Sequence, residues 1–292
     1  TLETNDQLQA TITAGSAAFT LNGLSAHDYP QLPEVEKDHV LTLPVPLFRQ
    51  VILQTSIAVS TAESRPILTG IHMVIANNQL KAVATDSHRL SQRIIPLEMP
   101  ATSNALTFEI TLPGKTLIEL SRIIDGLETI DFAITENQVL FQTETLSFYS
   151  RLLEGRYPDT DRLINDQFNT AITVVASDLV AAVDRASLMS HTDKNNIATL
   201  SINENRILLT GNSPEIGKVE EEIMVENYEG ASLEVSFNPD YLKDALRLFG
   251  SSEAKIQFLE ANRPFTLTLK DNHSDIPYSF IQLVTPVRTF NG

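Results

Sequence analysis

The chain has 292 residues, 42% of them hydrophobic, and a formal net charge of −16. It is too long for one small core, so we expect two or three domains of ordinary size. No apolar run is long enough to cross a bilayer, the first residues lack a signal-peptide pattern, and the absence of cysteine excludes disulfides and thiol catalysis; we expect a cytoplasmic protein.

Hydrophobic periodicity and turn residues predict four helices separated by antiparallel strands. The clearest helix has Asn238 as a good N-cap and Pro239 at its first position, and it ends before Gly250. Helices grouped beside antiparallel strands predict an α+β fold rather than a doubly wound one. In chain order the predicted elements are an extended segment at 2–13, a helix at 46–60, strands at 71–76 and 80–84, a helix at 113–125, strands at 130–134 and 139–141, a helix at 177–190, a strand at 199–202 and a helix at 238–249.

Two of the predicted helices carry further signals. In the helix at 113–125, Leu117, Leu120 and Ile124 fall on one face, as in a helix that packs on a core. Ser177 is the expected cap of the helix at 177–190. Asn77-Asn78 is the expected turn of a hairpin.

An internal repeat organises the chain. Tyr29-Pro30 recurs as Tyr157-Pro158, and the strand that begins at Phe108 recurs at Leu233, with offsets of 128 and 125 residues. Across the chain this period gives two complete repeats and a leading fragment, so we expect that an N-terminal portion is missing. The predicted domains are 1–38, 39–167 and 168–292.

The acidic excess avoids the predicted helices. Counted separately, the four helices carry net charges of +1, 0, −1 and 0, which sum to zero in a chain of −16. If the helices line one surface, that surface is less negative than the rest, and its field could guide DNA to it. The alternative is a solvated helix face with ordinary ion pairs. Such a DNA contact would be loose, independent of base sequence and sensitive to salt.

Three short motifs point to one known family. Ala84–Leu90 reads ATDSHRL, Leu153–Asp159 reads LEGRYPD, and Thr285–Arg288 reads TPVR. In this order and spacing, within the repeat, they resemble the bacterial DNA sliding clamp, the β subunit of the replicative polymerase. The resemblance covers the whole chain, and residues 1 to about 38 are similar to the end of the first clamp domain.

The resemblance implies a non-catalytic subunit that needs no cofactor and no metal. It implies a head-to-tail homodimer of three-domain subunits, in which repeated clamp domains form an arc of a ring and the helices face a hole for duplex DNA. The implied partners are duplex DNA without sequence preference, the replicative polymerase, the clamp loader and other proteins with Gln-Leu-Phe-type peptides. The tail Thr289–Gly292 continues beyond the family's usual end.

The family's functional residues carry over position by position. Apolar members of its partner-peptide pocket can form a cleft between the last two domains, and polar members its rim; the alternative for Leu90 and Val284 is ordinary core. The ring interface maps onto Phe19, Leu188 and Met189, and we expect Arg65, Arg122 and Arg185 to face DNA. The pocket set is Leu68, Thr85, Ser87, His88, Arg89, Leu90, Pro158, Arg162, Leu163, Asn238, Tyr241, Val284, Pro286, Val287 and Arg288.

Two other functions fit parts of the sequence. A hydrolase would use Asp86, Ser87 and His88, but adjacent residues point in different directions and cannot form a chain of nucleophile, base and orienting group. No P-loop, dinucleotide fingerprint or HExxH motif occurs, and the six histidines are scattered without a metal-ligand spacing. The other alternative is a non-DNA peptide-binding scaffold of the same fold, which has no reason to keep its helices neutral in so acidic a chain.

Overall fold

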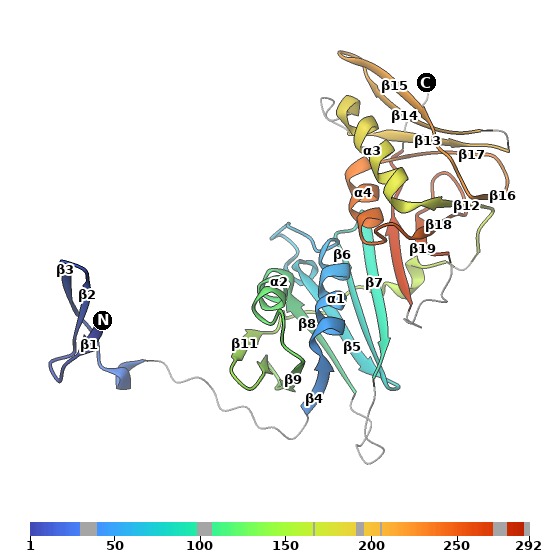
Figure 1. The fold of residues 1–292 in the computed structure, drawn as a ribbon. Helices are drawn as coiled ribbons and strands as arrows, with labels where there is room; N and C mark the ends of the chain where they lie inside the picture. Colours follow the sequence, from blue (N-terminus) through green and yellow to red (C-terminus); the bar gives the residue numbers. More distant parts are fainter. Residues whose placement is uncertain are drawn as a thin grey trace. The chain divides into compact units, whose positions relative to one another are not determined.

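The structure is a computed structural model that describes residues 1–29, 40–97, 107–165, 167–190, 196–204, 206–270 and 279–288. It contains two compact units, Thr1–Glu36 and Lys37–Gly292 (Figure 1). The predicted boundary near residue 38 and the tail at 289–292 lie outside the described residues.

The small unit is a three-stranded antiparallel sheet. Its strands follow one another along the chain in the order β1-β2-β3. Every residue of the last strand is exposed, which leaves one edge and most of both faces open to solvent. The strands are β1 Leu2–Thr4, β2 Gln9–Ala14 and β3 Ala17–Asn22, and a short 3-10 helix follows at Ala26–Asp28.

The large unit consists of two lobes with the same order of elements. We call residues 40–165 the first lobe and residues 167–288 the second lobe. The first lobe comprises β4 Val40–Pro44, α1 Val45–Ser56, β5 Gly70–Ala76, β6 Gln79–Thr85, β7 Arg89–Pro96, β8 Phe108–Pro113, α2 Gly114–Ile123, β9 Thr129–Ile134, β10 Gln138–Gln142 and β11 Ser147–Arg151, with 3-10 helices at Pro66–Thr69 and Asp161–Leu163.

The second lobe repeats that order with one extra strand, β16, so the predicted repeat and the α+β class are confirmed. Strand, helix, three strands, strand, helix and three strands recur in both lobes. The second lobe comprises β12 Thr170–Val175, α3 Ala176–Ser190, β13 Ala198–Ile202, β14 Ile207–Ser213, β15 Gly217–Glu222, β16 Asn227–Gly230, β17 Leu233–Phe237, α4 Pro239–Arg247, β18 Glu253–Phe258, β19 Phe265–Leu269 and β20 Phe280–Val284.

One continuous sheet joins the lobes. It has nine strands in the order β16-β12-β18-β19-β20-β7-β6-β5-β8, of which the first five come from the second lobe and the last four from the first lobe. The joint is the antiparallel pair β7–β20, in which Arg89 lies opposite Val284 and Arg93 opposite Phe280 (Figure 1). The outer sheets are β11-β10-β9-β4 in the first lobe and β15-β14-β13-β17 in the second. The two lobes therefore share backbone hydrogen bonds across their boundary.

The helices form where the sequence predicted them and pack in pairs, α1 with α2 and α3 with α4. Asn238 caps α4 by accepting a hydrogen bond from the Asp240 amide. Leu117, Leu120 and Ile124 are fully buried, as their shared face predicted. Each such leucine contributes about 2 kcal/mol through burial. The hairpin turn at Asn77-Asn78 is also confirmed, since both residues have positive φ, which type I′ turns require.

Two details of the predicted helices are wrong. The first helix ends at Ser56 rather than residue 60, because the amides of Ala58 and Val59 bond to carbonyls three residues back and close the last turn. Ser177 lies inside α3 and does not cap it. There β12 leads directly into the helix, and the amide of Ala176 donates to the Ser252 carbonyl instead.

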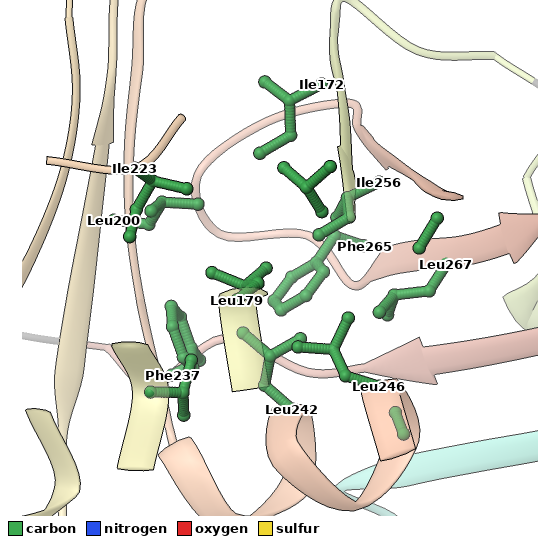
Figure 2. Close-up of a cluster of buried hydrophobic side chains, with 14 of the residues drawn as sticks. Ile172, Leu179, Leu200, Ile223, Phe237, Leu242, Leu246, Ile256, Phe265 and Leu267 are labelled. Carbon is green, nitrogen blue, oxygen red and sulfur yellow. The ribbon is translucent and has the colours of Figure 1, made fainter. Parts of the chain in front are cut away.

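Each lobe has its own core between its sheets and helices. In the first lobe Phe48, Phe132 and Phe141 meet edge to face or stacked, with ring centroids 4.6 to 5.9 Å apart. In the second lobe Leu179 of α3 and Leu242 of α4 point toward the sheet residues that surround Phe265 (Figure 2).

Candidate partner-binding site

A third, small apolar cluster lies at the joint between the lobes. Its buried members come from the 3-10 helix at Pro66–Thr69, from β6, β7 and β20, and from the segment that connects the lobes. Ile67 and Ile164 pack against it and are partly exposed. Because β7 and β20 pair directly, residues almost two hundred positions apart meet here. The buried members are Leu68, Val83, Leu90, Tyr157 and Leu283.

The turn between β6 and β7 is held by its own side chains. Asp86 Oδ1 accepts hydrogen bonds from the amides of His88 at 2.8 Å and Arg89 at 3.0 Å. Thr85 Oγ1 accepts from the Ser87 amide and donates to the Arg89 carbonyl at 2.7 Å. Ser87 adopts a positive φ of 81°, which these bonds stabilise. The turn therefore presents Ser87 and His88 to solvent in a fixed conformation.

Arg89 links this turn to α4 of the second lobe. Its Nε donates to Asp86 at 3.0 Å and its Nη1 to Asp244 at 2.7 Å. The guanidinium lies 4.7 Å from the centre of the Tyr241 ring, on which His88 also stacks at 6.1 Å. Burial raises the pKa of Tyr241, the Asp86 charge adds to this, and Arg89 opposes it. The result is a cationic and aromatic rim built from both lobes.

Tyr157 fixes the connecting segment beneath that rim. Its hydroxyl accepts a hydrogen bond from the Thr85 amide at 3.1 Å, and its ring stacks on His72 with centroids 4.6 Å apart. Burial raises the pKa of Tyr157 to about 12. Burial also lowers the pKa of His72 despite the nearby carboxylate of Glu109. Both rings are therefore neutral at pH 7.

The segment after β20 follows the same rim. The Thr285 amide donates to the His88 carbonyl at 2.9 Å, and the Val287 amide donates to the Ser236 carbonyl at 2.7 Å. The side-chain oxygen of Asn238, two residues after Ser236, also accepts a hydrogen bond from the side-chain amide of Asn196. The backbone of residues 285–288 is thus held against both lobes.

The structure brings most of the predicted pocket residues to the joint between the lobes, but in different environments. Leu68 and Leu90 form its buried floor. Val284 packs into the second lobe's core with no exposed surface, so it lies apart from the cleft expected for it. Thr85 is buried in the turn, and Asn238, Pro286 and Val287 are half-buried. On the open side lie Ser87, His88, Arg89, Tyr241, Pro158, Arg162, Leu163 and Arg288.

The three arginines expected to face DNA all have neighbouring partners. Arg65 donates to Ser87 at 2.7 Å, which places it beside the rim rather than on a helix. Arg122 of α2 pairs with Glu119 at 2.7 Å. Arg185 of α3 forms two hydrogen bonds to Glu221, at 2.5 and 2.8 Å, and these lower the pKa of that carboxyl.

Ion pairs also join the helices within each lobe. Arg49 of α1 pairs with Asp125, which follows α2, and Lys243 of α4 pairs with Asp184 of α3 at 3.2 Å. Most charged side chains of the helices are therefore paired, and the helices predicted from the sequence carry a net charge of zero.

Of the three residues expected at a subunit interface, Phe19 and Leu188 are exposed apolar side chains, and they belong to different units. Phe19 of β3 is 59% exposed. Leu188, near the end of α3, is 66% exposed, and Met189 beside it is partly buried. The helix that carries both packs against β14 and the edge strand β15.

Three residues of the site were missed by sequence reasoning. Asp86 enters the sequence analysis only as a hydrolase candidate, although an Asp at the start of a turn is a common acceptor for backbone amides two and three residues later. Tyr157 was noted for the repeat and not for a role. Asp244 lies three residues after Tyr241 on one helix face, and that spacing could have identified it.

Within the described residues, no group of three or more His, Asp or Glu side chains could hold a metal ion. None of the helices described is long and apolar enough to cross a membrane.

Comparison with known proteins matches both lobes. The family model described as DNA polymerase III beta subunit, central domain, matches residues 42–159, and the one described as its C-terminal domain matches residues 161–282. The beta sliding clamp of Bacillus subtilis is 41% identical over 291 residues, covering 99% of this chain and 75% of that protein.

Solved structures agree with these sequence matches. The beta subunit of the Streptococcus pyogenes DNA polymerase superposes with a TM-score of 0.91 at 43% identity, covering 99% of this chain and 76% of that one. The Pseudomonas aeruginosa sliding clamp bound to griselimycin gives 0.88 at 25% identity, with 99% and 75% covered. The chain therefore belongs to the family of the DNA polymerase III beta subunit, the beta sliding clamp.

Proposed function

We propose that the protein is a replication processivity factor, a ring-forming clamp that encircles duplex DNA and tethers the replicative polymerase. It acts without catalysing a reaction. The observation that carries the proposal is the meeting of three sequence motifs at one joint. ATDSHRL, LEGRYPD and TPVR lie far apart in the chain, but Leu90 and Tyr157 of the first two belong to one apolar cluster, and the Thr285 amide of the third donates to the His88 carbonyl of the first, between two family-matched lobes.

The joint has the chemistry of a short-peptide site. Ile67, Ile164 and the exposed Leu163 offer apolar contact above a buried floor. His88, Arg89 and Asn238 offer donors to an amide or carbonyl at the rim. A peptide with a Gln and a Leu-Phe pair fits this combination, since its apolar side chains would be buried and its amide held at the edge. The clamp loader and other replication proteins would compete for the same site with similar peptides.

Weak DNA contact is part of the proposal. Arg122 and Arg185 are paired with acids, and the helix surface is nearly neutral within an acidic protein. Such a surface neither repels the duplex strongly nor holds phosphates tightly. Encirclement, rather than affinity, would keep the protein on DNA and let it slide.

The joint between the lobes suggests how two subunits would assemble. β7 pairs with β20, the last strand of the next lobe. By its place in the repeat, β15 of the second lobe is the equivalent of β7, and β3 of the small unit is the equivalent of β20. Each of these two strands lies at the edge of its own sheet. A β15–β3 pair between two copies would reproduce the same joint head to tail. Phe19 on β3 and Leu188 beside β15 would then be covered.

Binding of a labelled polymerase C-terminal peptide, followed by fluorescence anisotropy, tests the peptide site. We expect saturable binding that is lost when the peptide's Leu-Phe pair is changed to Ala-Ala. No binding by protein whose fold is verified by circular dichroism would contradict the proposed site.

A second experiment tests encirclement. Protein loaded by the clamp loader onto nicked circular DNA should remain through gel filtration and should leave when the DNA is cut once. Retention on linear DNA would indicate ordinary binding and would overturn the ring.

A further inference from the structure

A hollow overlaps the proposed peptide site on the side of the connecting segment, since Arg162 and Leu163 belong to both. It has a volume of about 270 Å³ and is lined by both lobes. Arg162 and Leu163 come from the 3-10 helix at Asp161–Leu163, whereas Leu259 and Arg263 come from the loop between β18 and β19. We call it the linker hollow. Neither Arg263 nor Leu259 belongs to the pocket set carried over from the family.

The linker hollow continues directly from the apolar cluster. Ile164 packs against the buried floor of that cluster, and its neighbour Leu163 is 46% exposed and lines the hollow. A peptide whose apolar anchor contacts Ile164 could therefore extend to Leu163 at the wall of the hollow.

The charge of the hollow differs from that of the protein. Its described lining contains two arginines and no carboxylate, in a chain with a net charge of −16. Arg162 pairs with Asp159 at 2.8 Å, but both side chains are exposed, so that pair is weak. Arg263 forms no ion pair with any other described residue. Its backbone is fixed by a turn in which its amide donates to the Glu260 carbonyl.

The remaining lining suits a short side chain that ends in a charge. Leu163, Leu259 and Pro264 form apolar walls, and Asn165 and Gln257 supply amide donors. A carboxylate on one or two methylenes could contact the walls with its stem and the arginine with its head. A longer basic side chain would meet two like charges.

We propose that the linker hollow binds a carboxylate of the partner peptide, adjacent to its apolar anchor. The inference rests on the proposed peptide-binding function and specifies which partners that site prefers. The carboxylate comes either from an Asp or Glu side chain or from the peptide's own C-terminus. Both sources present the same group to Arg263.

Four labelled peptides that share the Gln and Leu-Phe core test this. The first ends at the Phe with a neutral amide, and the second ends at the Phe with a free carboxylate. The third and fourth have one more residue after the Phe, Glu in one and Gln in the other, and both end in an amide. At low salt the Glu or the free-carboxylate peptide should bind about twofold to fivefold more tightly than its neutral match, as expected for an exposed ion pair. The preference should shrink as salt is added.

Matched variants of the protein test whether Arg263 causes the preference for a carboxylate. Arg263→Gln should abolish the preference while leaving the affinity of the neutral peptide unchanged. Arg206→Gln is the control, because Arg206 is also exposed and pairs with Glu222 on a different sheet. Equal affinities for acidic and neutral peptides, or a preference that persists in Arg263→Gln, would overturn the inference alone. Failure of every peptide to bind would overturn it together with the proposed function.

Discussion

Arg89 and Asp244 are joined by an ion pair of 2.7 Å that crosses the boundary between the lobes. Arg89 begins β7 in the first lobe, and Asp244 lies on α4 in the second. A second carboxylate, from Asp86, holds the same guanidinium at 3.0 Å, so its position over Tyr241 is set from both sides. The pair therefore orients the rim of the proposed peptide site and connects the lobes.

Asp244→Asn should weaken peptide binding more than it weakens the fold. The Asp244 side chain is 36% exposed, so its loss should lower the free energy of unfolding by about 1 kcal/mol or less. Arg89 would lose one of two anchors, and we expect the peptide dissociation constant to rise about threefold to tenfold, since a rim donor would no longer be pre-positioned. Anisotropy and chemical denaturation measure the two quantities.

The control for that change is Glu119→Gln, which breaks an exposed pair with Arg122 away from the joint. It should alter neither quantity measurably. A normal peptide affinity in Asp244→Asn would show that Asp86 alone suffices to place Arg89.

Leu90→Ala and Val284→Ala should separate the cluster at the joint from the second lobe's core. Leu90 is 1% exposed in the joint cluster, and its truncation should cost about 2–5 kcal/mol of stability and also loosen the floor under the peptide. Val284 belongs to the second lobe's core, so its truncation should cost about 2 kcal/mol with a smaller effect on the peptide. Guanidinium denaturation and anisotropy at a temperature where both variants are folded test this; a larger binding loss in Val284→Ala would contradict it.

Local sequence signals predicted the elements of this fold well. Asn238 with Pro239 marked the start of α4, and the spacing of Leu117, Leu120 and Ile124 marked the buried face of α2. These signals depend on neighbours within a few residues. The β7–β20 joint could not be found in this way, because its partners are almost two hundred residues apart and no local pattern specifies which edge strands meet.

The residues of the proposed site came only from the resemblance to a family. Periodicity places Leu90 and Val284 in buried strands, and both are indeed buried, but it cannot say that Leu90 faces the joint cluster and Val284 a lobe core. Asp244 was missed because its partner, Arg89, lies in another lobe. Contacts between lobes depend on the packing of whole domains, which single-sequence patterns do not encode.

The double change Leu188→Lys and Met189→Lys should leave the protein monomeric. Leu188 is an exposed apolar residue next to the edge strand that we propose as half of the subunit interface. Two charges there would have to be buried without partners on assembly, which costs far more than the contacts gain. Analytical ultracentrifugation measures the mass. Ile123→Lys is the matched control, since Ile123 is 52% exposed at the end of α2 and should tolerate the charge; dimers that persist in the double variant would place the interface elsewhere.

Stability should fall steeply in alkali because of Tyr157. Burial raises the pKa of Tyr157 from 10.0 to about 12, so the folded protein retains a proton that the unfolded chain loses. Its contribution is fully present below pH 10 and is lost as the pH rises to about 12, a change of about 2 kcal/mol. Denaturation curves across this range measure the loss, and tyrosinate absorbance should show late ionisation that is reduced when Tyr157 is removed.

Tyr157→Phe is the control for that loss. The variant should be less stable at neutral pH, because the Thr85 amide loses its acceptor in a buried position, at a cost of about 1–3 kcal/mol. Above pH 10 its stability should fall less steeply than that of the parent, so the two curves converge. If the two stability curves stay parallel above pH 10, Tyr157 ionises at the ordinary pKa of a tyrosine. The contact between the connecting segment and the β6–β7 turn would then open before the protein unfolds.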